Sequence, residues 1–256
     1  MGAAAVLMRS GTTEDNRLHF RFPQEKAIES GVLVASHWWR KPYLEAIQVF
    51  AEENDCELVS IGQLIAEGEL TVTDGHGSPS SHFHGRGDVP YIKVVDIKNW
   101  RINENPSYQI PEAEAKRLRR TKTLKAWDLV TPTRASRNIG LFSVVMPWQT
   151  DVILTREITV WRVQPAAKLL SPWLLLELMS LRVVHDQFNF AVLMQMNRED
   201  LGKRFREVVL PIPRTGNVRR AWGAPIERYL KAQEAARTSY TELGELLAPE
   251  LFADRP

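Results

Sequence analysis

Short segments rich in β-branched residues, each bounded by proline, glycine or aspartate, limit the possible folds more than any other feature of this sequence. Four of them lie in the middle of the chain, at 89–96, 128–131, 141–146 and 152–163, and a strand stopped by proline follows at 208–213. Segments of this length and composition are typical of β-strands. The chain therefore cannot be a helical bundle, and it needs at least one sheet.

Helical patterns lie on both sides of these strands. Ser171 and Pro172 form a strong helix start, an N-cap followed by proline at the first helical position. The sequence predicts helices at 42–53, 171–184, 197–205 and 225–247, and a short helix or turn within 60–70 that ends near Gly68. Strands and helices together predict a mixed α/β fold without internal repeats.

The order of elements divides the chain into four parts. We expect an N-terminal arm at 1–36, a lead-in helix at 37–54, one mixed α/β domain at 55–215 and a C-terminal amphipathic helix at 216–256. The apolar residues of the last part keep a three-four spacing, which places them on one stripe of a helix. Such a stripe fits contact with a second copy or a partner.

Charge is distributed unevenly along the 256 residues, although 33 Lys and Arg nearly balance 31 Asp and Glu. Residues 86–137 carry twelve basic and six acidic side chains, and residues 198–220 carry seven and three, whereas both ends of the chain are acidic. Concentrated positive charge indicates a polyanionic partner, most often nucleic acid. Charge alone leaves open that each basic run is only a solvated face.

Two basic groups have the residue types that contact DNA. Six cations fall within 116–125, and on a helix Lys116, Arg119 and Arg120 would share one face that meets phosphates. The loop at 131–140 holds arginine and asparagine, which can pair with guanine and adenine. A second patch follows, made of the basic residues at 203–206 together with Arg214, Arg219 and Arg220.

Known catalytic patterns are missing. No phosphate-binding glycine loop occurs, the lone Cys56 excludes an internal disulfide framework, and the longest apolar run, 173–176, is too short to span a bilayer. His76, His82 and His84 lie close together in a predicted loop but match no defined zinc spacing. We expect no catalytic residue, metal or cofactor, and a cytoplasmic location.

Several motifs resemble the target recognition domain of type I restriction–modification specificity subunits. Residues 87–97 resemble that family's Gly-Asp-Ile-Pro-Trp-Ile-x-x-x-Asp-Ile segment. Residues 124–130 are similar to its Leu-x-x-Gly-Asp-Ile-Leu strand, with Ala126 and Trp127 where the family has glycine. Residues 209–213 are similar to its proline-rich ending, and the resemblance covers roughly 38–215.

The resemblance implies a non-catalytic module for double-stranded DNA. Such a module reads bases from a basic cleft and directs a partner methyltransferase or nuclease, here in a restriction or related phage-defence system. A full specificity subunit has two such domains joined by two long helices, so this chain resembles a half subunit. A homodimer of it would prefer a split palindromic site.

The basic residues then take two expected roles. Phosphate contacts are expected from Lys116, Arg117, Arg119, Arg120, Lys122, Lys203, Arg204 and Arg206. Base contacts are expected from the 74–87 loop and from Lys98, Asn99, Arg101, Arg134, Arg137 and Asn138, and Lys93 belongs to the same DNA-binding set.

Two other functions remain open on the sequence. The chain could be a scaffold that keeps the recognition fold but binds protein through its apolar helices. It could also be a metal-dependent nuclease that uses His76, His82 and His84.

Overall fold

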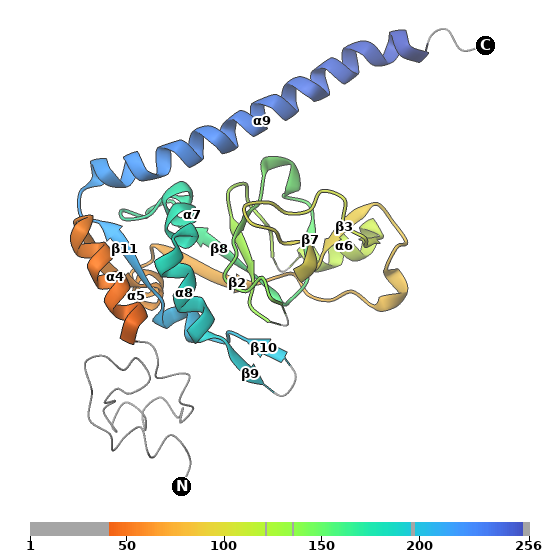
Figure 1. The fold of residues 1–256 in the computed structure, drawn as a ribbon. Coiled ribbons are helices and arrows are strands. Elements are labelled where there is room, and N and C mark those ends of the chain that lie inside the picture. Colours follow the sequence, from red (N-terminus) through yellow and green to blue (C-terminus); the bar gives the residue numbers. More distant parts are fainter. Residues whose placement is uncertain (1–40, 121, 135, 196–197, 253–256) are drawn as a thin grey trace.

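Two sheets form the centre of the protein (Figure 1). The computed structural model describes residues 41–252, with residues 121, 135 and 196–197 excepted. The larger sheet is antiparallel, in the order β2 (Leu70–Asp74), β8 (Ile158–Val163), β5 (Leu129–Pro132) and β6 (Ser143–Val144). The smaller one has the order β4 (Gln109–Ile110), β3 (Val89–Ile92) and β7 (Ile153–Leu154), and its β3 and β7 run parallel. The predicted mixed α/β fold is confirmed.

The larger sheet separates two apolar cores, because successive side chains of a strand point to opposite faces. Leu129 and Trp161 face the first core. That core is shared with β1 (Cys56–Ser60), β11 (Val209–Pro213) and the helices α4 (Lys41–Glu53), α5 (Ile61–Ala66), α7 (Pro172–Ser180) and α8 (Arg182–Ala191). Val130 and Val160 face the second core, which includes residues of the smaller sheet. Cys56 is buried, as expected of a small apolar side chain.

Helix α7 begins where the sequence predicts. The Ser171 side chain accepts a hydrogen bond from the Leu174 N–H at 3.1 Å and so caps the helix. The expected single helix to residue 184 is wrong, because Leu181 adopts an extended conformation and packs on the first core. A second helix, α8, starts directly after it.

Three predicted strands are shorter than expected. The one at 89–96 ends at Ile92, since the Asp96 carboxylate accepts the Lys93 N–H at 3.0 Å and closes a 3-10 turn, η2 (Val94–Asp96). The one at 152–163 divides into β7 and β8, where the Ile158 N–H bonds to the Thr155 carbonyl. Only Ser143 and Val144 of 141–146 form a strand.

The predicted helix at 197–205 is also wrong, although Asn197 itself lies outside the described residues. A hairpin of β9 (Leu193–Gln195) and β10 (Arg198–Asp200) occupies this place, followed by the 3-10 turn η4 (Arg204–Glu207). The Leu201 N–H donates to the Thr133 carbonyl at 2.9 Å, which ties the chain to β5 instead of to a helical turn.

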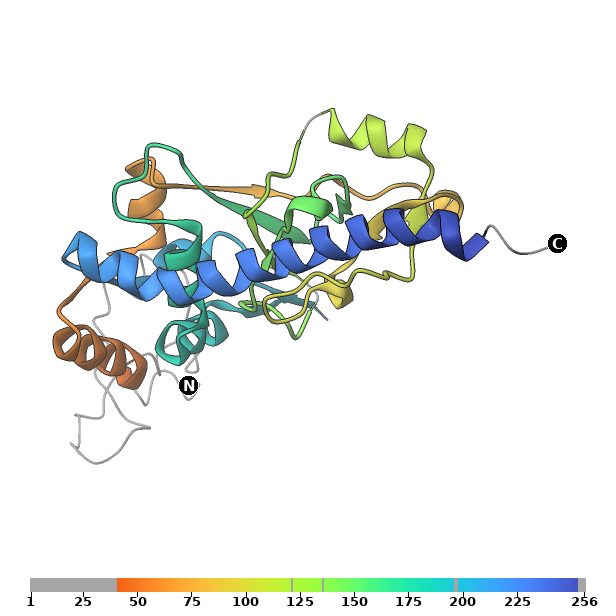
Figure 2. The same cartoon turned by 90° about the horizontal axis from the view of Figure 1, so that it is seen from above.

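The last helix, α9 (Gly216–Phe252), begins nine residues before Pro225, the start expected from its apolar spacing, and at the first residue of the expected C-terminal part, 216–256. Its first part packs on α7: a Cβ on Gly223 would lie 3.0 Å from the Leu174 nitrogen, and Ile226 and Leu230 are buried. Beyond Leu230, most residues up to Gly244 are exposed. Figure 2 shows α9 lying along the domain, and Figure 1 shows the β9–β10 hairpin on the opposite side. No helix among the described residues is long and apolar enough to cross a membrane.

Candidate nucleic-acid interface

Three strand ends meet at one edge of the larger sheet. Strand β2 ends at Asp74, β8 begins at Ile158 and β5 ends at Pro132. The register pairs Asp74 with Thr159 and Thr159 with Thr131, so these ends lie side by side. Loops that leave such an edge place their side chains next to one another.

One cavity of about 300 Å³ lies on the first-core side of this edge. Arg134 comes from the loop after β5, while Lys203 and Arg206 come from the segment around η4. They line this cavity together with Asp74 and Thr159. The Leu201–Thr133 backbone bond described above joins the two basic segments, which are about 70 residues apart in the sequence.

A second cavity, of about 240 Å³, lies on the other face of β2 and β8 and is lined by Thr73, Lys122 and Arg162 among others. The Lys122 Nζ donates to the carbonyl oxygens of Asp74 and Gly75, at 2.7 and 2.9 Å. Asp74 and Thr73 line both cavities. We call four cations around this end of the sheet the basic edge. They come from three separate parts of the sequence and are Lys122, Arg134, Lys203 and Arg206.

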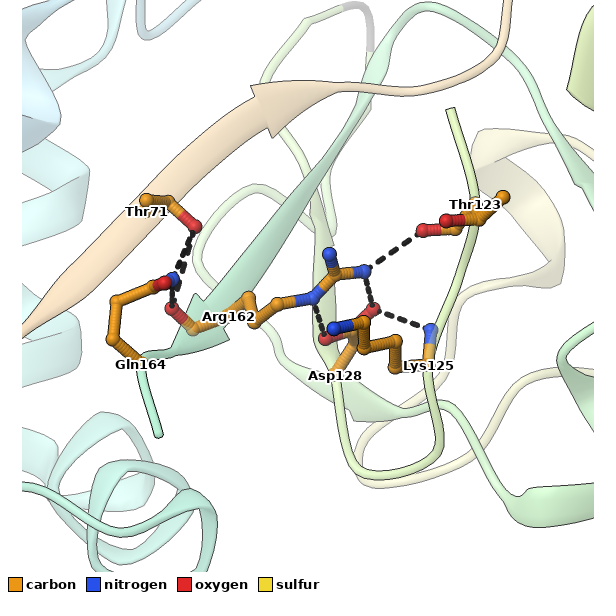
Figure 3. Close-up of polar contacts among 6 residues, drawn as sticks. All are labelled: Thr71, Thr123, Lys125, Asp128, Arg162 and Gln164. Atoms are coloured by element: carbon orange, nitrogen blue, oxygen red, sulfur yellow. Dashed lines mark hydrogen bonds and ion pairs between the residues drawn. The ribbon is translucent and has the colours of Figure 1, made fainter. Parts of the chain in front are cut away.

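A buried ion pair fixes the segment that carries Lys122 (Figure 3). The Arg162 guanidinium binds the Asp128 carboxylate with two bonds, 2.7 and 2.6 Å long, and also donates to the Thr123 carbonyl at 2.8 Å. Asp128 accepts the Lys125 N–H at 2.8 Å as well. The hydrogen bond to Asp128 raises the pKa of Arg162 above its ordinary value. The loop at 122–128 is thereby held against β8.

Helix α6 (Glu112–Arg119) carries three of the expected phosphate contacts, and a fourth, Arg120, follows it directly. Lys116 and Arg120 are exposed. Arg119 instead turns back toward the domain, where its Nε donates to the Asp151 carbonyl at 3.1 Å and its Nη1 pairs with Glu112. Arg117 forms an ion pair of 2.6 Å with Glu114 and lowers the pKa of that carboxyl group. The structure therefore directs only part of this helix's charge to solvent.

The expected base contacts Lys98, Asn99 and Arg101 form the tip of a hairpin closed by a bridge between Ile97 and Ile102. The tip is attached to the helices, because Arg101 donates to the Tyr229 hydroxyl at 3.2 Å and the Trp100 indole donates to the Ser180 hydroxyl at 2.9 Å. None of the three residues lines either cavity at the basic edge.

The remaining residues of the predicted DNA-binding set have mixed surroundings. The Lys93 ammonium lies 3.2 Å from the centroid of the Tyr108 ring. Asn138 donates to the Ile97 carbonyl at 3.0 Å, and Arg204 donates to the Ala191 carbonyl at 2.6 Å. Arg137 is exposed. Lys93, Asn138 and Arg204 thus have contacts within the domain that account for their positions.

The three loop histidines have different surroundings. His76 is buried, and its Nδ1 accepts the Leu154 N–H at 3.0 Å. Desolvation, with a further effect of Lys122, lowers the pKa of His76 to about 4. His82 is exposed and bonds to Ser80, while His84 stacks on Tyr91. Within the described part of the chain, no three His, Cys, Asp or Glu residues are arranged to hold a metal ion.

Sequence reasoning missed the role of Arg162 and gave no role to its partner, Asp128. Asp128 was recognisable only as the aspartate of a family motif, and nothing in the sequence marks Arg162, 34 residues later, as its partner. The same motif contains Trp127, whose φ of 73° lies in the left-handed region that favours glycine. Trp127 and Trp100 are both partly buried and pack on the first core.

Comparisons with known proteins complete this description. No protein-family model matches the sequence, and no curated protein matches it. Among solved structures, the chain is similar to the type I restriction–modification S subunit from M. genitalium, with a TM-score of 0.47 and 10% identity over 77% of this chain and 45% of that one. It is similar to the HsdS subunit from Thermoanaerobacter tengcongensis, with a TM-score of 0.43 and 16% identity over 87% of this chain and 52% of that one.

A third similar structure comes from work on complex assembly and conformational transition of the type I restriction–modification system. Its TM-score is 0.44, with 14% identity over 95% of this chain and 65% of that one. The chain thus spans about half to two thirds of the length of these proteins.

Proposed function

We propose that this chain is a sequence-recognition module for double-stranded DNA, the specificity component of a restriction–modification or related defence system in the cytoplasm. It carries no reaction itself and directs a partner methyltransferase or nuclease. The family motifs at 87–97 and 124–130 suggest this function. The basic edge, which those motifs do not include, supports it independently.

The basic edge is the observation that carries the proposal. Four cations from separate segments gather around one end of a sheet, beside the exposed Thr73 hydroxyl group and Asp74 carboxylate. Cations fixed on a rigid scaffold are suited to hold the phosphates of a duplex, while neighbouring hydroxyl and carboxylate groups face its bases. We assign the phosphate contacts to Arg134, Lys203 and Arg206, which moves Arg134 from the expected base contacts to the phosphate contacts. Lys122, whose ammonium already binds the Asp74 and Gly75 carbonyl oxygens, adds its charge to the same edge, and Lys116 of α6 and Arg120 after its end remain exposed candidates.

Salt-dependent DNA binding tests this assignment. Neutralising two phosphate contacts should reduce the slope of log affinity against log salt by about 2 in magnitude, equally on all sequences. The variant is Lys203→Ala/Arg206→Ala, and the matched control is Lys231→Ala, an exposed lysine on α9. Fluorescence anisotropy with a labelled duplex measures both. An unchanged slope in the double variant would remove the basic edge from the interface.

The exposed part of α9 supports a second element of the proposal, a helical contact with another copy of this chain. Tyr240 is 77% exposed and Leu243 is 50% exposed, although both belong to the apolar stripe. Large apolar side chains arranged along one helix face suit helix–helix packing. A dimer formed in this way would hold two basic edges and prefer a two-fold split site.

Molar mass in solution tests the dimer. Tyr240→Glu/Leu243→Glu should convert a dimer to a monomer in light scattering, whereas Val95→Glu, at an exposed apolar residue outside α9, should leave it unchanged. A wild-type protein that is monomeric at all concentrations would contradict homodimerisation. If such a monomer also lacked DNA affinity at physiological salt, the alternative of a protein-binding scaffold would replace the DNA proposal.

A further inference from the structure

One acidic side chain stands in the middle of the basic edge. Asp74 lines the cavity that contains Arg134, Lys203 and Arg206, and also the cavity on the other face that contains Lys122. Its side chain is exposed. Within the described part of the chain, the Asp74 carboxylate has no hydrogen bond or ion pair, although three cations line the same cavity.

The backbone of Asp74 is held in place. It is the last residue of β2 and pairs with Thr159, and its carbonyl oxygen accepts the Lys122 ammonium at 2.7 Å. The next residue, Gly75, is closely packed, since a Cβ there would lie 2.2 Å from the Thr155 carbonyl oxygen. The Asp74 Cα is therefore fixed relative to the cations, and a short side chain keeps its carboxylate within a few ångströms of that point.

The position of this carboxylate determines what can lie over it. A phosphate would be repelled by Asp74 and attracted by the cations on either side of it. A duplex bound to the basic edge would therefore place phosphates on the flanking cations and a groove over Asp74. A carboxylate accepts hydrogen bonds and donates none, so it needs an amino group from the base edge.

We propose that Asp74 is a specificity-determining residue that accepts a hydrogen bond from the amino group of a cytosine in the major groove. In that groove cytosine presents an amino donor, whereas guanine presents two acceptors and adenine places an acceptor next to its amino group. A carboxylate is repelled by each of those acceptors. This inference rests on the proposed DNA recognition and adds the base class that one position selects.

Selection from a randomised duplex pool tests the proposal. The wild-type protein should enrich a motif with cytosine at one position of each half-site. Asp74→Asn should lower the preference for cytosine at that position by about tenfold and leave the other positions unchanged. Its affinity for scrambled duplexes should stay equal or rise, because a negative charge leaves the basic surface.

A control and a second variant make the result decisive. Glu242→Gln, at an exposed carboxylate on α9, should select the wild-type motif. Asp74→Ala should lose the cytosine preference as Asp74→Asn does, and equal unfolding midpoints would show that both variants fold. An unchanged motif in both, or a loss of affinity equal on all sequences, would overturn the role of Asp74 alone. A wild-type protein that enriches no motif would overturn the proposed base reading together with it.

Discussion

Removing one partner of the Asp128–Arg162 ion pair should destabilise the protein strongly. The Asp128 side chain is 2% exposed and the Arg162 side chain 26% exposed, and two short charge-assisted bonds join them. Breaking a fully buried pair costs about 3–5 kcal/mol, because a charge remains without a partner in a poorly solvated place. Since water reaches part of Arg162, we expect Asp128→Asn to cost about 2–4 kcal/mol.

The two single variants should differ in a direction that the burial sets. Arg162→Met leaves the almost fully buried Asp128 charge alone, whereas Asp128→Asn leaves a guanidinium that water can reach. Arg162→Met should therefore cost more free energy of unfolding than Asp128→Asn. In the double variant the loss should be smaller than the sum of the two single losses, because the second substitution removes the uncompensated charge.

Urea unfolding followed by circular dichroism measures these differences as shifts of the midpoint at constant slope. Arg182→Met is the control, because the Arg182 side chain is 92% exposed and lies 3.6 Å from Asp186. Removing this surface pair should lower the free energy of unfolding by no more than about 0.5 kcal/mol. If Asp128→Asn and Arg162→Met each lowered the free energy of unfolding by less than about 1 kcal/mol, the pair would behave like one on the surface, and the predicted strong destabilisation would be wrong.

Three further predictions concern stability. His76 takes up a proton near pH 6.5 in the unfolded state but only near pH 4 in the folded state. The free energy of unfolding should therefore fall by about 3 kcal/mol as the pH drops from 6.5 to 4. In His76→Gln, urea unfolding should show a smaller fall over this pH range. Gly75→Ala should lower the melting temperature clearly, because its Cβ meets the Thr155 carbonyl, whereas Gly244→Ala, with open space around it, should not. Glu104→Gln should speed amide hydrogen exchange in α9 beyond residue 231, because it breaks the 2.9 Å ion pair with Arg237. The free energy of global unfolding should change by less than about 1 kcal/mol.

The sequence predicted elements well where local signals are strong. The Ser171–Pro172 start and the β-branched strand near 158–163 are such places. It failed where a contact with a distant residue decides the conformation. The break at Leu181 depends on packing against the first core, and the segment after β10 depends on the bond from Leu201 to Thr133.

The candidate site shows the same limit. The composition shows where basic residues lie in the sequence. Only the sheet register shows that Lys122 and Arg134 come to the same end of the sheet, and only the three-dimensional structure shows that Arg101 is bonded to α9. Charge counts also treat all cations alike. Arg119 and Arg204 use their guanidinium groups to bind backbone carbonyls, which no count reveals.

Selection of binding sites from a randomised duplex pool at two salt concentrations is the direct test of sequence recognition by this protein. We expect the wild-type protein to enrich a defined sequence and to bind every sequence more weakly at the higher salt concentration. The Lys203→Ala/Arg206→Ala variant should retain less of every duplex and still enrich the same sequence, because it loses phosphate contacts and no base contact. Retention of duplexes with no enriched sequence, or no retention at either salt concentration, would contradict a sequence-recognition function.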